Sequence, residues 1–358
     1  MNLQGPALLE AIRYLPTIRS RQAELRGYSE LRPSTKGIIH PIVSVGKLGR
    51  VDGVAQVLDT VTERIGPCFI DLNPHSGQTC ADFETYADPS DNYGSWRELF
   101  AGRQGITPIA LLRDGATERP FIRQVLLIEQ AFGVVVVRTR RPAQDLPALQ
   151  AALSAVDDVN NVLIVLDMGY IRGALEPKVA EARRVITALR LVDPTTRIAV
   201  ISSSFPRAVS AYGDQSGSLE ITERDLHIQM GGDEVAIYGD HASIYPEPFE
   251  PSAARWVPRI DYSLEDSWRF ERRREDGGGF RACAQALMAS PDWDEAWAND
   301  VWGAGKIRET ANAHQTPPGF GSPANWIAAR VNMHIERQSL AFSGLDGEED
   351  IDPEEPLG

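Results

Sequence analysis

Two stretches decide the fold, "GVVVVRT" at residues 133–139 and "NVLIVLD" at residues 161–167. In both, apolar residues follow one another without the polar alternation of a strand that has one face in water. Such runs are typical of strands that are buried on both faces of a parallel sheet. A helical pattern follows each run, at 146–156 and at 177–192. The two stretches therefore predict consecutive strand–helix units.

Similar apolar runs occur along most of the chain and extend this prediction. Further strands are predicted at 37–45, 67–72, 106–112, 197–204 and 234–240, with an eighth at either 259–263 or 267–273. Eight strands that alternate with helices predict an α/β fold of the (β/α)8 TIM-barrel-like class, with a C-terminal helical extension. An open doubly wound sheet is the alternative. It would usually have a glycine-rich first turn, and the sequence has neither GxGxxG after a strand nor GxxxxGK[ST].

The domain organisation follows from changes in composition along the chain. We predict an N-terminal helical extension at 1–36, an α/β barrel at 37–275, C-terminal helices packed on the barrel at 276–343 and a disordered acidic tail at 344–358. The long segment 73–104, rich in polar turns and aromatic residues, is expected to cover the C-terminal mouth of the barrel.

Composition limits the classes of function. The formal net charge is −14, which argues against an overall basic surface for duplex nucleic acid but leaves a local basic groove open. The three cysteines form no CxxC pair, a pattern that fits a reducing cytoplasm. The N-terminus has no signal-peptide pattern, and no apolar stretch approaches the ~20 residues of a membrane-spanning helix. We therefore expect a cytoplasmic protein with no membrane partner.

Charged and aromatic residues recur where the predicted strands end, and in this barrel class functional groups lie at the C-terminal strand ends. The residues at or near these ends are Lys47, Asp71, Arg113, Arg138, Arg140, Asp167, Tyr238, Asp240, His241, Tyr262, Arg269 and Arg272. Serines 202–204 also end a strand, but no GxSxG surrounds them, so turn chemistry is the better interpretation.

These residue types together predict a phosphoryl site. Asp71, Asp167 and Asp240 are candidate ligands for a hard cation such as Mg²⁺ or Mn²⁺. The candidate catalytic residues are Lys47, Asp167, Asp240 and His241. The candidate phosphate- or ligand-binding residues are Arg113, Arg138, Arg140, Arg269, Arg272, Tyr238 and Tyr262. The structural alternative for each aspartate is a turn or a helix cap.

Several motifs, in order along the chain, resemble those of the phage and bacterial beta protein family. They are "HPIVSVGK", "IVLDMG", "ISSSFP", "IYGDHASI", "RIDYSLEDSWRFER", "WGAGKI" and "GSPANWIAARVNMHIERQ", between residues 40 and 338. The resemblance implies a TIM-barrel-like fold and association with phage, mobile-element or defence gene neighbourhoods, but no established reaction. The positions that match the family motifs are Lys47, Asp167, Gly239, Asp240, Tyr262, Trp268 and Arg272. This chain departs from the usual pattern in having His241 where an aromatic residue is common, and "RFERRR" after the tryptophan where many members have Arg-Gly.

Three functions remain open from the sequence. The first is a metal-dependent phosphoesterase-like hydrolase that acts on a nucleotide or a nucleic-acid end. The second is a non-catalytic binder of a nucleotide or a phage component, with arginines and aromatic residues lining its pocket. The third is an interaction protein of a neighbouring defence operon, with tryptophans 293, 297, 302 and 326 as contact residues.

Overall fold

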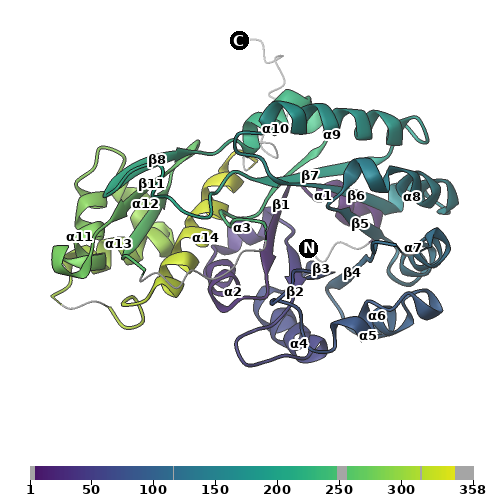
Figure 1. The fold of residues 1–358 in the computed structure, drawn as a ribbon, viewed down its shortest axis with the longest axis horizontal. Coiled ribbons are helices and arrows are strands. Elements are labelled where there is room, and N and C mark those ends of the chain that lie inside the picture. The colour runs from purple at the N-terminus through teal and green to yellow at the C-terminus, as the bar shows by residue number, and fades with distance from the viewer. Residues whose placement is uncertain (1–4, 116, 248–255, 315–316, 343–358) are drawn as a thin grey trace, which may run out of the picture.

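A closed barrel of eight parallel strands forms the centre of the molecule (Figure 1). The computed structural model describes residues 5–115, 117–247, 256–314 and 317–342. Around the barrel, the strands are β1 (Tyr14–Arg19), β2 (Ile42–Val45), β3 (Cys68–Leu72), β4 (Ile106–Ala110), β5 (Val135–Thr139), β6 (Val162–Tyr170), β7 (Arg197–Ser203) and β9 (Ile237–Asp240). β1 pairs with both β2 and β9, which closes the sheet. The predicted fold class is confirmed.

Helices surround the barrel in the strand–helix order that the sequence predicts. Those after successive strands are α2 (Gln22–Ser29), α4 (Val54–Ile65), α7 (Glu118–Phe132), α8 (Pro142–Ala155), α9 (Leu175–Arg190) and α10 (Glu223–Met230). The short helix α1 (Pro6–Ala11) precedes β1, and the short helix α3 (Pro33–Ile38) lies between α2 and β2. No helix within the described ranges is both long and apolar enough to cross a membrane.

The barrel interior is filled by alternate residues of the strands, because successive side chains of a strand point to opposite faces. The inward residues form one apolar cluster that contains Leu15, Ile42, Phe69, Ile109, Val136, Leu163, Val165, Ala199 and Ile201. Their neighbours, such as Val135, Val137, Ile164 and Leu166, pack outward against the helices. This alternation decides which polar residues reach the mouth.

A second, smaller layer lies beside the barrel, at the left of Figure 1. It is an antiparallel sheet in the order β10 (Arg259–Ser263), β11 (Ser267–Arg272) and β8 (Ser216–Glu220). It is packed with α11 (Gly279–Met288), α12 (Glu295–Asp300), α13 (Trp302–Asn312) and the long α14 (Pro323–Leu340). α14 also packs on α2, and it covers the outer face of the barrel at β1 and β9.

The prediction of the eighth barrel strand is wrong. Both candidate segments belong to the antiparallel sheet. One face of this sheet is apolar and the other is polar, so apolar and polar residues alternate along these two strands, which they do not along the buried strands of the barrel. The missing barrel strand is β1, "YLPTIR", inside the segment that was expected to be helical. Pro16 and Thr17 interrupt its apolar run, and proline within a short run argues against a strand. The proposed domain boundaries otherwise stay a prediction, and the tail at 344–358 lies outside the described residues.

The prediction that the segment 73–104 covers the barrel mouth is wrong. Its helices α5 (Phe83–Tyr86) and α6 (Gly94–Glu98) lie on the outside of the barrel, where the helix between β3 and β4 belongs (Figure 1). Trp96 is fully buried there, and its Nε1 donates a 3.0 Å hydrogen bond to the carbonyl oxygen of Ile109. Only Asn73 and His75, at the start of the segment, reach the mouth pocket. The aromatic residues of this segment therefore serve packing rather than closure.

Gly239 of β9 is the position where the barrel interior tolerates no side chain. An added Cβ would overlap the Cγ2 of Ile201 and come within 2.9 Å of the carbonyl oxygen of Leu15. We expect Gly239→Ala to lower the free energy of unfolding by about 1–3 kcal/mol, because an overpacked core must shift its backbone. Urea unfolding measures this. The control is Gly37→Ala in α3, where an added Cβ meets nothing within 4 Å. Equal stabilities of the two variants would contradict the packing argument.

Candidate functional site at the barrel mouth

The inward rows of the strands change from apolar to polar as they reach the C-terminal mouth. Two residues beyond the apolar Phe69, Val136 and Val165, the inward positions are Asp71, Arg138 and Asp167. In the same way Ser44 follows Ile42, and Thr17 and Arg19 follow Leu15. The strand period of two thus places a polar layer directly on the apolar core.

Arg138 is the centre of this layer. Its guanidinium is buried, and Nη1 donates to Asp71 Oδ2 and Ser44 Oγ, both at 2.9 Å. Nη2 donates to Asp167 Oδ2 at 2.7 Å. Burial lowers the pKa of Arg138 and Arg140 lowers it further, while the two carboxylates oppose these effects. A buried guanidinium between two carboxylates holds the strand ends of β3, β5 and β6 in fixed positions.

Arg140 lies above Arg138 and is more accessible. Its Nη2 is 2.5 Å from Asp71 Oδ2, and its Nε is 3.8 Å from Asp167 Oδ2. About 30% of its side chain is exposed, compared with 2% for Arg138. Arg140 is therefore the guanidinium of this pair that a ligand can reach.

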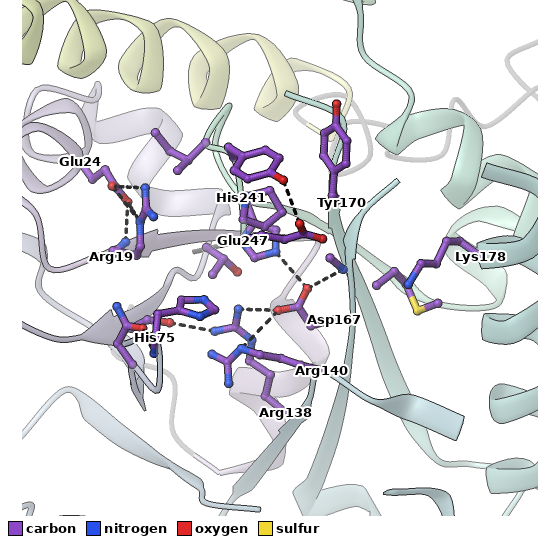
Figure 2. Close-up of a pocket in the computed structure, with 18 residues that line it drawn as sticks. Arg19, Glu24, His75, Arg138, Arg140, Asp167, Tyr170, Lys178, His241 and Glu247 are labelled. Carbon is purple, nitrogen blue, oxygen red and sulfur yellow. Dashed lines mark hydrogen bonds and ion pairs between the residues drawn. The ribbon is translucent and has the colours of Figure 1, made fainter. Parts of the chain in front are cut away.

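His241 completes the group from the end of β9. Its Nε2 lies 3.0 Å from Asp167 Oδ1, and the same carboxylate oxygen accepts the backbone N–H of Gly169 at 3.0 Å (Figure 2). Burial alone would raise the pKa of Asp167. The interactions of Asp167 with His241 and Arg138, including the hydrogen bond from His241, outweigh burial and hold that pKa well below its usual range. Asp167 is therefore an ionised acceptor that orients the imidazole.

A β-bulge at the end of β6 shapes the rim beside Asp167. The pairing of β6 with β7 shifts register between Asp167 and Tyr170, and Gly169 has a positive φ of 64°. This left-handed conformation suits glycine. The bulge brings Tyr170 to the rim, where its ring packs edge-on against Tyr245 with centroids 5.0 Å apart.

These groups surround a cavity of about 340 Å³ that opens at the mouth (Figure 2). Its cationic side chains are Arg19, Arg138, Arg140 and Lys178, and its acidic ones are Glu24, Asp167 and Glu247. Arg19 is held by Glu24, with Nη2 2.9 Å from Oε1. Among the described residues, the ion-pair partner of Lys178 in α9 is Glu181, at a distance of 3.9 Å. The cavity thus combines internally paired charges with two accessible cations, Arg140 and Lys178.

Two further polar groups face this cavity. Burial, with smaller effects from Arg140 and Arg19, lowers the pKa of His75 to about 4, so its imidazole is neutral at pH 7. Thr17 Oγ1 is buried and has no hydrogen-bond partner among the described residues. A buried hydroxyl without a partner is costly, and a ligand or water in the cavity would satisfy it.

The structure brings together five of the predicted site residues: Asp71, Arg138, Arg140, Asp167 and His241. Lys47 lies outside this cavity and pairs with Asp52 at 3.1 Å, while Arg113 pairs with Glu84 at 2.9 Å on the outer rim.

Three predicted residues lie in the antiparallel sheet, remote from the mouth. Arg269 pairs with Asp292 at 2.7 Å, and Arg272 lies 3.8 Å from Asp214. Tyr262 packs on Trp293 and Trp297. These residues were predicted at the mouth because the sequence analysis assigned β10 and β11 to the barrel.

Asp240 and Tyr238 point outward from β9, toward α14. Asp240 is completely buried and accepts hydrogen bonds from the hydroxyls of Tyr14 and Tyr238 at 2.9–3.0 Å and from the backbone N–H of Ala242 at 2.7 Å. His334 Nε2 is 3.0 Å from its Oδ2. Burial raises the pKa of Asp240, but His334 and these hydrogen bonds outweigh it and lower that pKa below its usual value.

The three aspartates predicted to share a cation therefore do not meet. Asp240 contacts His334 on the outside of the barrel, whereas Arg138 binds both Asp71 and Asp167 inside it. Within the described part of the chain, no group of three or more histidine, cysteine or acidic side chains is placed to hold a metal ion. The donor set at the mouth fits a guanidinium cluster, not a metal centre.

Sequence reasoning missed Thr17, Arg19 and Glu24, because β1 was not recognised. It also missed Tyr170, Lys178 and the loop after β9 with Tyr245 and Glu247. The signal for Arg19 was available: it ends the short stretch Leu15 to Ile18 in the same way that Asp167 ends the apolar run "NVLIVLD".

Comparison with known proteins finds similarity over almost the whole chain. The family model described as Beta protein matches residues 14–340, from the first residue of β1 to the last residue of α14. Protein beta of Enterobacteria phage P4 is 33% identical over 348 residues, which cover 96% of this chain and 97% of that protein. The similarity therefore spans the barrel and the C-terminal helices together.

Proposed function

Since the chain belongs to the Beta protein family, we propose that its barrel mouth binds a small phosphate ester and that His241 acts on the ester as a general base and acid. The observation that carries the proposal is the position of Asp167. One carboxylate accepts from His241 on one side and from Arg138 on the other, at the end of the barrel where such folds keep their active sites.

The contact with Asp167 determines which imidazole nitrogen can react. With Nε2–H directed at the carboxylate, Nδ1 carries the lone pair. No hydrogen bond to Nδ1 is found among the described residues, and His241 lines the cavity. An imidazole oriented by a carboxylate is the arrangement that general bases use.

The cations supply the binding energy for a phosphate. Arg140 and Lys178 are each about one third exposed and reach the cavity from different elements, Arg140 from the end of β5 and Lys178 from the first turn of α9. A guanidinium offers two parallel N–H groups to a phosphate, and an ammonium adds a point charge. A cavity of about 340 Å³ is of the size that holds a small organic ligand.

The reaction class that this arrangement supports is hydrolysis. A water molecule forms the new oxygen–phosphorus bond as the ester oxygen–phosphorus bond breaks. His241 Nδ1 takes the water proton and returns it to the departing alkoxide. Arg140 and Lys178 neutralise the charge on the phosphoryl oxygens.

The relative from phage P4 supports a setting in phage biology. Nucleotides and nucleic-acid ends are the phosphate esters that a phage and its host both handle. They are therefore the first compounds to test.

The experiment is a hydrolysis screen of nucleotides, short oligonucleotides and simple phosphomonoesters and diesters, read as product release. We expect turnover by the wild type and a loss of about 10²–10⁴-fold in His241→Ala, the range that a general base contributes. His314→Ala is the matched control, because His314 is exposed and lies outside the cavity. If His314→Ala loses as much activity as His241→Ala, or no ester is hydrolysed, the catalytic proposal fails.

Binding without catalysis is the second candidate. It is favoured by the complete pairing of Asp71 and Asp167 with arginines, which leaves the mouth assembled as an anion receptor. In that case nucleoside monophosphates should raise the melting temperature of the wild type and of His241→Ala but not of Arg140→Gln. Turnover distinguishes the two candidates.

A further inference from the structure

A second pocket lies outside the barrel, between the antiparallel sheet, residues 207–210 and one face of α14. Its volume is about 270 Å³, and it shares no lining residue with the mouth cavity. Among the described residues, four arginines line it, Arg207, Arg259, Arg272 and Arg330, together with one carboxylate, Asp261. The described part of the lining therefore carries an excess of positive charge, in a chain whose formal net charge is −14.

Arg330 forms the floor of this pocket. It is 4% exposed, and its Nη1 donates to Asp261 Oδ2 at 2.8 Å. Its guanidinium stacks on Phe205 at 4.0 Å from the ring centroid. Its Nε is buried and has no hydrogen-bond partner among the described residues. A buried guanidinium N–H without an acceptor is a donor that a ligand can satisfy.

Asp261 cannot neutralise the arginines around it. It is shared by Arg330 and Arg259, whose Nε lies 3.1 Å from Oδ1. Among the described residues, Arg272 has one ion pair, at 3.8 Å, with Asp214, whose side chain is 97% exposed, and its Nη1 donates a 3.4 Å hydrogen bond to the carbonyl oxygen of Asp214. Ion pairs this exposed contribute little, so the charge of Arg272 is available to an anion.

An aromatic surface adjoins the arginines. Trp256 lines the pocket and is 48% exposed, an unusual exposure for a side chain of this size. Its ring is held by stacking on Phe280, with centroids 5.7 Å apart and planes at 24°. Arginines beside an accessible aromatic ring are the combination that proteins use for nucleotides, phosphate on guanidinium and base on ring.

We propose that this pocket binds the phosphate and base of a single nucleotide. Two sources have this chemistry, a free nucleoside 5′-monophosphate and the 5′-phosphorylated end of a single strand. The volume fits about one nucleotide, which disfavours binding of a longer internal segment.

The test uses calorimetric titration with AMP in full-length protein that carries Arg140→Gln, so that binding at the barrel mouth does not contribute. We expect AMP to bind this protein, and Arg272→Gln added to it to weaken binding by about tenfold, the loss of one charge-assisted hydrogen bond. The matched control is Arg273→Gln, because the neighbouring arginine is similarly exposed but does not line the pocket. Trp256→Ala should weaken the binding of AMP but not that of inorganic phosphate.

Oligonucleotides distinguish the two sources. Tighter binding of a 5′-phosphorylated strand than of AMP assigns the pocket to strand ends, and tighter binding of AMP assigns it to free nucleotides. Equal binding of 5′-phosphorylated and 5′-hydroxyl strands overturns the proposal, because the terminal phosphate would then not be recognised. Absence of AMP binding in the Arg140→Gln protein, or equal losses in Arg272→Gln and Arg273→Gln, also overturns it. Each of these results leaves the hydrolysis screen at the barrel mouth unaffected.

Discussion

Asp240→Ala is expected to lower the free energy of unfolding by about 3–5 kcal/mol, the cost of breaking a buried charged network. The substitution removes the shared acceptor of Tyr14, Tyr238, His334 and the backbone of Ala242, all of them buried. Trp268 Nε1 lies 3.2 Å from His334 Nδ1 and donates to it, which leaves the Nε2 hydrogen directed at Asp240.

Urea unfolding followed by circular dichroism measures the loss. Asp59→Ala is the matched control, because that carboxylate also has an ion-pair partner, Arg103, but its side chain is 63% exposed. The control should change stability by only about 0–1 kcal/mol. If Asp240→Ala were as stable as the control, Asp240 would not be structural, and the functional role first predicted for it would have to be reconsidered.

Arg138→Met is expected to destabilise the protein by about 3 kcal/mol at pH 7, because it leaves Asp71 and Asp167 buried with only Arg140 and His241 to compensate them. The loss should shrink as the pH falls. In the wild type the folded-state pKa of Asp167 lies below its unfolded value. Its contribution is therefore complete above the unfolded pKa of about 3.9 and disappears as the pH falls through the folded pKa.

In the Arg138→Met variant, the shift in the folded-state pKa of Asp167 has the opposite direction. Without Arg138, Asp167 stays buried beside the carboxylate of Asp71, so the folded-state pKa of Asp167 rises above the unfolded one. Protonation then favours the folded variant. Urea unfolding at pH 7 and at pH 4.5 should show the difference from wild type narrowing at the lower pH. Arg113→Met, which breaks a half-exposed ion pair with Glu84, should show a small loss at both values. A pH-independent difference for Arg138→Met would contradict this account.

The sequence was sufficient to predict the barrel because seven of its strands are apolar on both faces. β1 was missed for two reasons. Pro16 and Thr17 interrupt its apolar run, and its pairing with β2 and β9 is a long-range feature that strand propensity alone does not show. The antiparallel pair β10 and β11 was assigned to the barrel because strand propensity does not say which sheet a strand joins.

The site was predicted only in part, and strand period explains both the success and the failure. Asp167 and Arg138 share the inward parity of Val165 and Val136 and so reach the mouth. Gly239 is inward, and therefore His241 is inward and Asp240 is not. Counting by twos from the core would have separated these two residues. The partner of Asp240, by contrast, is His334, which lies 94 residues further along the chain. No local sequence pattern predicts a contact at that separation.

That distance has a consequence for the nascent chain. The carboxylate of Asp240 leaves the ribosome 94 residues before the imidazole that it binds, and Tyr14 leaves it 226 residues before Asp240. At ordinary rates of elongation, on the order of 5–20 residues per second, the seam between the first and last barrel strands waits several seconds for α14. During that interval its tyrosines and its carboxylate lack the cover of α14. Translation speed between codons 240 and 334 thus determines how long the emerging barrel presents a face to chaperones and proteases.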